Sequence, residues 1–143
     1  MPGQTFAHSA STSKDVGSVW AELDKPVTWE GVPGVDRVID PKVDAEGRLQ
    51  GFAFSSKVGG AAYRATASPA GREEGRMMAW AIDSSEIEGK ITVRLAPNGD
   101  GTKVEVNLEA DGTGVLGSLL FPVIAAAIGN GFASTVDKFV ADL

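Results

Sequence analysis

The chain has 143 residues, of which 43% are hydrophobic and 22% charged. This size and composition fit one globular domain with a buried core and exclude disorder and a fibrous repeat. With 13 Lys and Arg against 19 Asp and Glu, the formal net charge is −6, so we expect no nucleic-acid partner. The absence of cysteine and the presence of one histidine exclude disulfides, thiolate catalysis and a His-rich metal cluster. We therefore predict a single domain over residues 1–143, with no cofactor and no metal site.

The first elements are a strand and a short helix. Residues Thr5 to Thr12 alternate loosely and predict a strand, after which Ser13 is the expected N-cap of a helix from Lys14 to Asp24. Its apolar side chains recur with helical spacing on one face, at Val16, Val19, Trp20 and Leu23. A second short helical turn is predicted from Pro26 to Trp29, before a turn at Gly31-Val32-Pro33-Gly34. The first fifteen residues lack the basic and apolar segments of a signal peptide, so a cytoplasmic location is expected.

A succession of strands is predicted from Val35 to Ala110. Turn-forming residues recur at hairpin spacing, so consecutive strands should be antiparallel neighbours. Alternation is clearest from Ile87 to Leu95 and from Val104 to Leu108, which indicates a sheet with one solvated face. The predicted turns lie at Asp44-Ala45-Glu46-Gly47, Gly59-Gly60, Pro69-Ala70-Gly71, Ser84-Ser85 and Asn98-Gly99-Asp100-Gly101.

The last part of the chain contains 25 residues without a charge, from Gly112 to Val136. That length is compatible with a membrane span, but Ser118, Pro122, Asn130 and several glycines favour a helix that lies along the sheet. We predict a helix from Leu120 to Ala141, about 33 Å long at ~1.5 Å per residue. The side chains expected to face the sheet are Leu120, Ile124, Ile128, Phe132, Val136 and Phe139.

The opposite side of this segment is also nearly free of polar groups. A helix that covers a sheet needs only one apolar stripe, so the second face predicts a further contact. A second copy of the chain or a partner subunit is the expected occupant, with a membrane surface less favoured. The residues on this face are Val115, Leu119, Val123, Ala126 and Ala133.

The order of these elements and several short strings resemble the START-like superfamily, also called SRPBCC or helix-grip, which includes polyketide cyclase-type and lipid-transfer proteins. Val19-Trp20 and Trp29 are typical markers of it. A closer similarity, to proteins like the G subunit of carbon monoxide dehydrogenase, rests on Val19-Trp20 together with Val32-Pro33-Gly34-Val35, Gly99-Asp100-Gly101-Thr102 and Leu116-Gly117-Ser118-Leu119. The resemblance implies an α+β helix-grip fold, in which a curved antiparallel sheet wraps around a long C-terminal helix and two short helices follow the first strand.

The resemblance also implies a cavity between the sheet and the terminal helix that binds an apolar small molecule. The residues allow this interpretation, because bulky side chains on the inner face oppose a helix rich in Ala and Gly. The same pattern fits a plain hydrophobic core, since burial stabilises the fold with or without a ligand. The expected ligand-binding residues are Trp29, Phe52, Phe54, Tyr63, Met78, Trp80, Ile82, Ile91, Val93, Phe121, Ile124, Ile128 and Phe132.

No catalytic residue is assigned from the sequence. His8 has no serine or acid at a diagnostic spacing, and Asn98-Gly99-Asp100-Gly101 lacks the length and terminal Glu of a calcium loop. Three hypotheses stay open. The first and preferred one is a carrier of a polyketide-like, quinone or fatty-acyl ligand. The second is a cyclase or hydrolase that uses His8, Tyr63 or Asp83 to place a proton. The third is a module that recruits a partner through the uncharged helix.

Overall fold

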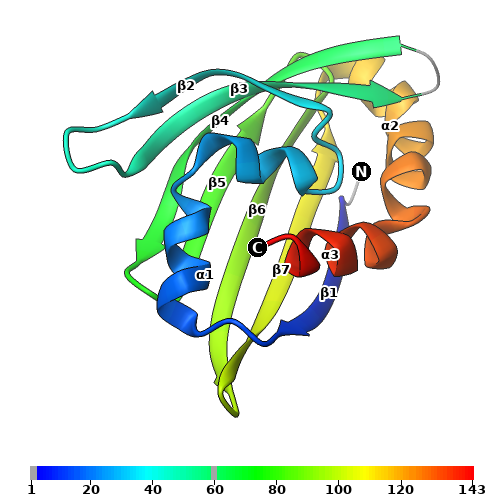
Figure 1. The fold of residues 1–143 in the computed structure, drawn as a ribbon. Helices are drawn as coiled ribbons and strands as arrows, with labels where there is room; N and C mark the ends of the chain where they lie inside the picture. The colour runs from blue at the N-terminus through cyan, green and yellow to red at the C-terminus, as the bar shows by residue number, and fades with distance from the viewer. Residues whose placement is uncertain (1–2, 59–60) are drawn as a thin grey trace.

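The computed structural model describes residues 3–58 and 61–143 (Figure 1). One antiparallel sheet has the strand order β1-β7-β6-β5-β4-β3-β2, so strands that are consecutive from β2 to β7 are neighbours, and β1 pairs with β7. The elements are β1 (Gln4–Thr12), α1 (Val16–Leu23), the 3-10 helix η1 (Pro26–Gly31), β2 (Arg37–Val43), β3 (Leu49–Val58), β4 (Ala61–Glu73), β5 (Met77–Asp83), β6 (Ile87–Asn98), β7 (Gly101–Gly112), α2 (Gly114–Gly129) and α3 (Phe132–Ala141).

The sheet is strongly curved, and its concave face carries the helices. Figure 1 shows α1, η1 and α3 in front of this face, with α2 along the side where β1 and β7 lie. Helix α3 contacts β1 and η1, whereas α2 contacts mainly β7. The α+β helix-grip architecture predicted from the sequence is confirmed.

Helix α1 begins two residues later than predicted. Asp15, rather than Ser13, is its N-cap, and the Asp15 carboxylate accepts a hydrogen bond from the Ser18 backbone N–H at 3.4 Å. The buried face predicted for this helix is present, since Val19 and Leu23 are fully buried.

The prediction of a turn at Pro69-Ala70-Gly71 is wrong. These residues lie inside β4, where the register with β5 shifts between Pro69 and Gly71. Proline is tolerated at such a bulge because the ladder is interrupted there, so the hydrogen bond that its missing N–H would donate is not needed. The chain reverses instead at residues 74–76, where Gly75 takes a positive φ of 74°. The predicted Gly59-Gly60 turn lies outside the described residues.

The predicted continuous helix from Leu120 to Ala141 is two helices. The axes of residues 117–129 and 132–141 differ by 51°. Asn130 is extended and Gly131 is left-handed, with φ of 85°, which ends α2 and places Gly131 as the N-cap of α3. No single helix among the described residues is long and apolar enough to cross a membrane, although this bent pair together meets the length and composition criteria.

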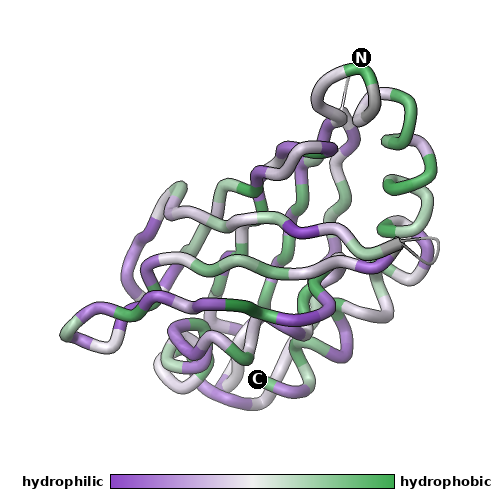
Figure 2. The backbone as a smooth tube through the Cα atoms, turned by 90° about the horizontal axis from the view of Figure 1, so that it is seen from above, coloured by the Kyte–Doolittle hydropathy of each residue, from purple (hydrophilic) through white to green (hydrophobic). Residues whose placement is uncertain are grey.

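The inward stripe predicted for the last helix is correct in both pieces. Ile124, Phe132, Val136 and Phe139 are buried, and Leu120 and Ile128 are half-buried. The outer face of α2 is equally apolar and is exposed, by 82% at Val115, 72% at Leu119 and 58% at Val123. In Figure 2 the trace of α2 is accordingly green over most of its length.

Candidate ligand-binding cavity

A cavity lies between the concave face of the sheet, the loop after η1 and the inner face of α2. Its walls come from the inward-facing positions of β3 to β7 and from two α2 side chains. The residues that line it are Trp29, Val32, Pro33, Gly34, Val35, Phe52, Phe54, Ser56, Tyr63, Ala65, Ile82, Ser84, Glu86, Ile87, Glu88, Gly89, Ile91, Leu108, Glu109, Ala110, Ile124 and Ile128.

The cavity is a narrow slot. The hollow has a volume of about 790 Å³ when the part open to solvent is included. The space in which the centre of a water molecule fits is only about 60 Å³. That space holds a few water molecules. A ligand with two or more rings therefore requires the cavity walls to move apart.

Aromatic rings form one end of the slot. The Phe52 ring lies 6.2 Å from the Trp29 ring and 6.1 Å from the Phe54 ring, centroid to centroid. The Trp29 indole Nε1 donates a hydrogen bond to the Leu23 carbonyl at 2.8 Å, which fixes the ring against α1. Trp80 packs edge-on behind these rings, 5.4 Å from Phe52. These contacts make this end rigid and apolar.

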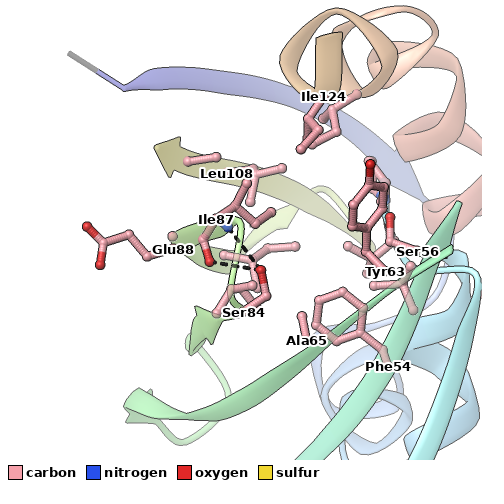
Figure 3. A pocket seen from close by; sticks show the side chains of 18 of the residues that line it. Phe54, Ser56, Tyr63, Ala65, Ser84, Ile87, Glu88, Leu108 and Ile124 are labelled. Atoms are coloured by element: carbon pink, nitrogen blue, oxygen red, sulfur yellow. Dashed lines mark hydrogen bonds between the residues drawn. The ribbon is translucent and has the colours of Figure 1, made fainter. Parts of the chain in front are cut away.

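Two hydroxyl groups of the wall lie on neighbouring strands. Ser56 on β3 and Tyr63 on β4 are directly paired across the strands. Figure 3 shows the Tyr63 ring standing in the slot with its hydroxyl toward Ile124, and the Ser56 hydroxyl beside it. The third hydroxyl, of Ser84, is already engaged, because it accepts from the Ile87 N–H at 3.0 Å and donates to the Ile87 carbonyl at 3.1 Å.

The structure brings eight of the thirteen residues expected to bind a ligand to the cavity wall. They are Trp29, Phe52, Phe54, Tyr63, Ile82, Ile91, Ile124 and Ile128. The other five belong to the hydrophobic core and do not line the cavity. They are Met78, Trp80, Val93, Phe121 and Phe132.

Several cavity residues were missed from the sequence. Ser56 follows Phe52 and Phe54 at strand period, and Ala65 follows Tyr63, so alternation alone could have indicated them. The loop Val32 to Val35 carried no comparable signal, because its place under α2 depends on the tertiary fold.

The proton-transfer candidates other than Tyr63 lie away from the cavity. His8 Nε2 is 2.8 Å from Asp137 Oδ1 on α3, and neither residue lines the cavity. Asp83, at the end of β5, is exposed and is not part of the wall. In the parts of the chain that the structure describes, no group of three or more His, Asp or Glu side chains is placed to hold a metal ion.

A curved sheet that grips its C-terminal helices over an apolar slot defines the START-like class of proteins. The sequence matches the family described as polyketide cyclase / dehydrase and lipid transport over residues 5–143, and the chain belongs to that family.

Solved structures share the fold at low sequence identity. The Zhui aromatase/cyclase from Streptomyces sp. R1128 superposes with a TM-score of 0.75 at 10% identity, covering 96% of this chain and 91% of that one. A protein from Thermus thermophilus, TTHA0849, gives 0.73 at 12% identity over 96% and 97% of the two chains. A START superfamily protein from Mycobacterium smegmatis gives 0.64 at 10% identity over 94% and 97%. No curated protein matches the sequence. The similarity to the G subunit of carbon monoxide dehydrogenase stays a prediction.

Proposed function

We propose that the protein binds and carries a small hydrophobic molecule in the cavity between the sheet and α2. The observation that carries this proposal is the apolar slot itself, which the core does not fill. The family's description as polyketide cyclase / dehydrase and lipid transport supports the same class of ligand. A polyketide-like aromatic, a quinone or a lipid fits the wall chemistry.

The slot widens most readily at the C-terminal end of α2. This helix contacts mainly β7, and its C-terminal end meets the bend at Asn130 and Gly131. Its N-terminal end is held to the turn between β5 and β6, where the Thr113 hydroxyl donates a hydrogen bond to the Ser85 carbonyl at 3.1 Å. A surface hollow shares Val32 to Val35, Ser56 and Ile128 with the cavity, so these residues lie between the two. We infer that the ligand passes between the 32–35 loop and α2.

A carrier fits the cavity better than an enzyme does. Acid–base chemistry needs a titratable group within hydrogen-bond reach of the reacting atom and, in most enzymes, a second group that assists it. Tyr63 is the one candidate among His8, Tyr63 and Asp83 that lines the cavity. Of the glutamates at its edge, Glu88 points away from the slot in Figure 3 and Glu109 is exposed. A cyclase that relies on the Tyr63 hydroxyl and on substrate folding is the alternative.

Two measurements test the carrier proposal. Native mass spectrometry of protein purified from cells should show an additional bound mass. Titration with naphthalene, followed by amide NMR shifts, should move the signals of Phe54, Ala65 and Ile124. For a natural ligand of about twenty heavy atoms, a binding free energy of ~0.3 kcal/mol per atom corresponds to a dissociation constant of roughly tens of micromolar. The proposal fails if no mass is found and the cavity signals do not respond.

The outer face of α2 supports a second role. Val115, Leu119 and Val123 are large, apolar and exposed on one side of the helix that roofs the cavity. We propose that a second copy or a partner subunit covers them in the working form.

The cytoplasmic location also stays a prediction.

A further inference from the structure

We propose that the cavity selects an uncharged hydrophobic ligand whose neutral oxygen atoms hydrogen-bond to the hydroxyls of Ser56 and Tyr63, and that it rejects carboxylates. This inference rests on the proposed carrier function and specifies its ligand. It separates the polyketide-like and quinone candidates, which carry ketone or phenol oxygens, from free fatty acids.

The two hydroxyls form one subsite. The β3–β4 register places Ser56 opposite Tyr63, and the next inward pair is Phe54 opposite Ala65. Directly opposite side chains on one face of an antiparallel pair have Cβ atoms about 5 Å apart. The Tyr63 hydroxyl stands at the far end of its ring, and Figure 3 shows the Ser56 hydroxyl beside that ring, so both hydroxyls face the same part of the slot.

Neither hydroxyl is engaged within the wall. In Figure 3, dashed lines join Ser84 to Ile87, but none joins Ser56 or Tyr63 to another of the residues drawn. Each hydroxyl can donate one hydrogen bond and accept others. A ketone, a phenol or an alcohol can therefore bond to the pair, and an entirely apolar ligand would leave both hydroxyls dry and unpaired at a cost in affinity.

The remaining polar groups of the wall do not compete for this ligand oxygen. The Trp29 indole N–H is bonded to the Leu23 carbonyl, and the Ser84 hydroxyl is bonded within its own turn. The Glu88 side chain points out of the cavity in Figure 3. Ser56 and Tyr63 thus set the orientation of the ligand, with its apolar body toward Phe52 and Trp29.

The charges around the slot disfavour an anion. Among the described residues that line the slot, none is Lys, Arg or His. Of the acidic residues Glu86, Glu88 and Glu109, Glu88 points out of the slot in Figure 3 and Glu109 is exposed, so both place negative charge around the slot rather than within it. Lys57, the basic residue of the adjacent surface hollow, is 72% exposed and lies 3.9 Å from the Asp36 carboxylate. A carboxylate in the slot would lose hydration without gaining a cationic partner, and this cost is large for a buried charge.

A matched set of probes tests the inference. Naphthalene, 2-naphthol and 2-naphthoate share one ring system and differ only in the substituent, which is absent, neutral or anionic near neutral pH. Each is titrated into the full chain and followed by amide NMR shifts at the cavity. The variants are Tyr63→Phe and Ser56→Ala. Ser55→Ala is the control, because Ser55 is adjacent on β3 and faces away from Tyr63, opposite Arg64.

We expect 2-naphthol to bind at least roughly ten-fold more tightly than 2-naphthoate. At least one of Tyr63→Phe and Ser56→Ala should weaken 2-naphthol roughly 2- to 12-fold, the range of one net hydrogen bond, without weakening naphthalene. Ser55→Ala should change nothing. The proposed ligand selectivity is contradicted if 2-naphthoate binds as tightly as 2-naphthol, or if the variants weaken naphthalene and 2-naphthol equally. In either case the proposed carrier function is unaffected. If none of the three probes shifts the cavity signals, both proposals are overturned.

Discussion

The guanidinium of Arg72 is joined to the carboxylate of Asp24 by two parallel hydrogen bonds, from Nη1 to Oδ1 at 2.8 Å and from Nη2 to Oδ2 at 2.9 Å. Asp24 is the C-cap of α1, and its Oδ1 also accepts from the Leu49 backbone N–H at 3.1 Å. Arg72, near the end of β4, lies 5.1 Å from the centre of the Trp20 ring on α1. This contact therefore fastens α1 to both β3 and β4.

The Asp24→Asn variant should be less stable near neutral pH by about 1–2 kcal/mol, because it removes a charge-assisted pair that is mostly shielded from water. Burial works to raise the pKa of Asp24, but the hydrogen bonds from Arg72 and Leu49 and the nearby positive charges outweigh it, so this pKa lies below its ordinary value. The stabilisation is then fully present above the unfolded-state pKa, about 3.9, and is lost as pH falls through the folded-state pKa.

Urea unfolding at a series of pH values checks this prediction. The stability difference between the wild type and Asp24→Asn should be constant near neutral pH and shrink in strongly acidic solution. Glu22→Gln serves as the control, because Glu22 pairs with Lys25 on the surface of the same region and should change stability by less than about 0.5 kcal/mol. A difference that persists unchanged at low pH would contradict the role assigned to Asp24.

Helix α2 begins in close contact with the turn between β5 and β6. A Cβ atom on Gly117 would lie 2.2 Å from the Glu86 carbonyl oxygen, which belongs to the backbone and cannot rotate away. Gly117→Ala should therefore push the first turn of α2 off the sheet and destabilise the protein by roughly 1–3 kcal/mol. Thermal unfolding and amide exchange along α2 measure this, with the exposed Ser118→Ala as the control. Equal melting temperatures and equal exchange for wild type and Gly117→Ala would show that the contact is not tight.

Much of the sheet could be predicted because its signals are local. Alternation from Ile87 to Leu95 fixes which side chains face the core, and Asn98 to Gly101 forms the expected turn. The mistake at Pro69 to Gly71 has a physical reason, since a bulge and a turn both use residues that leave the regular ladder. Glu73 and Glu74 gave no turn signal, although Gly75 does have the positive φ that the reversal needs.

The cavity was less predictable than the fold, because alternation shows which face a side chain takes but not its position along the sheet. Met78 and Val93 share a face with Ile82 and Ile91, yet they lie deeper in the core, where Met78 pairs with Val93. The bend at Asn130 and Gly131 had a local signal, a glycine after a helical run, but the continuous apolar stripe on both sides of it favoured one long helix. Burial alone left core and cavity indistinguishable.

The outer face of α2 makes a separate prediction. Leu119→Glu should leave the free energy of unfolding within about 0.5 kcal/mol of the wild type, because the side chain is 72% exposed. If a second copy covers this face, the wild type should be larger than a monomer by light scattering, and the charged variant should dissociate. A wild type that is monomeric at high concentration would contradict the dimer. Loss of folding in the variant would mean that Leu119 belongs to the core.

Filling the slot should abolish ligand binding without changing the fold. Ala65 lies on the inner face of β4, opposite Phe54, and lines the cavity. Ala65→Leu adds three carbon atoms to a space in which a water-sized sphere has only about 60 Å³, so naphthalene affinity should fall at least roughly ten-fold while overpacking costs about 1–3 kcal/mol. Ala62→Leu on the exposed face of the same strand controls for the added apolar surface. Naphthalene binding by Ala65→Leu with unchanged affinity and unchanged NMR shifts would place the ligand elsewhere on the protein.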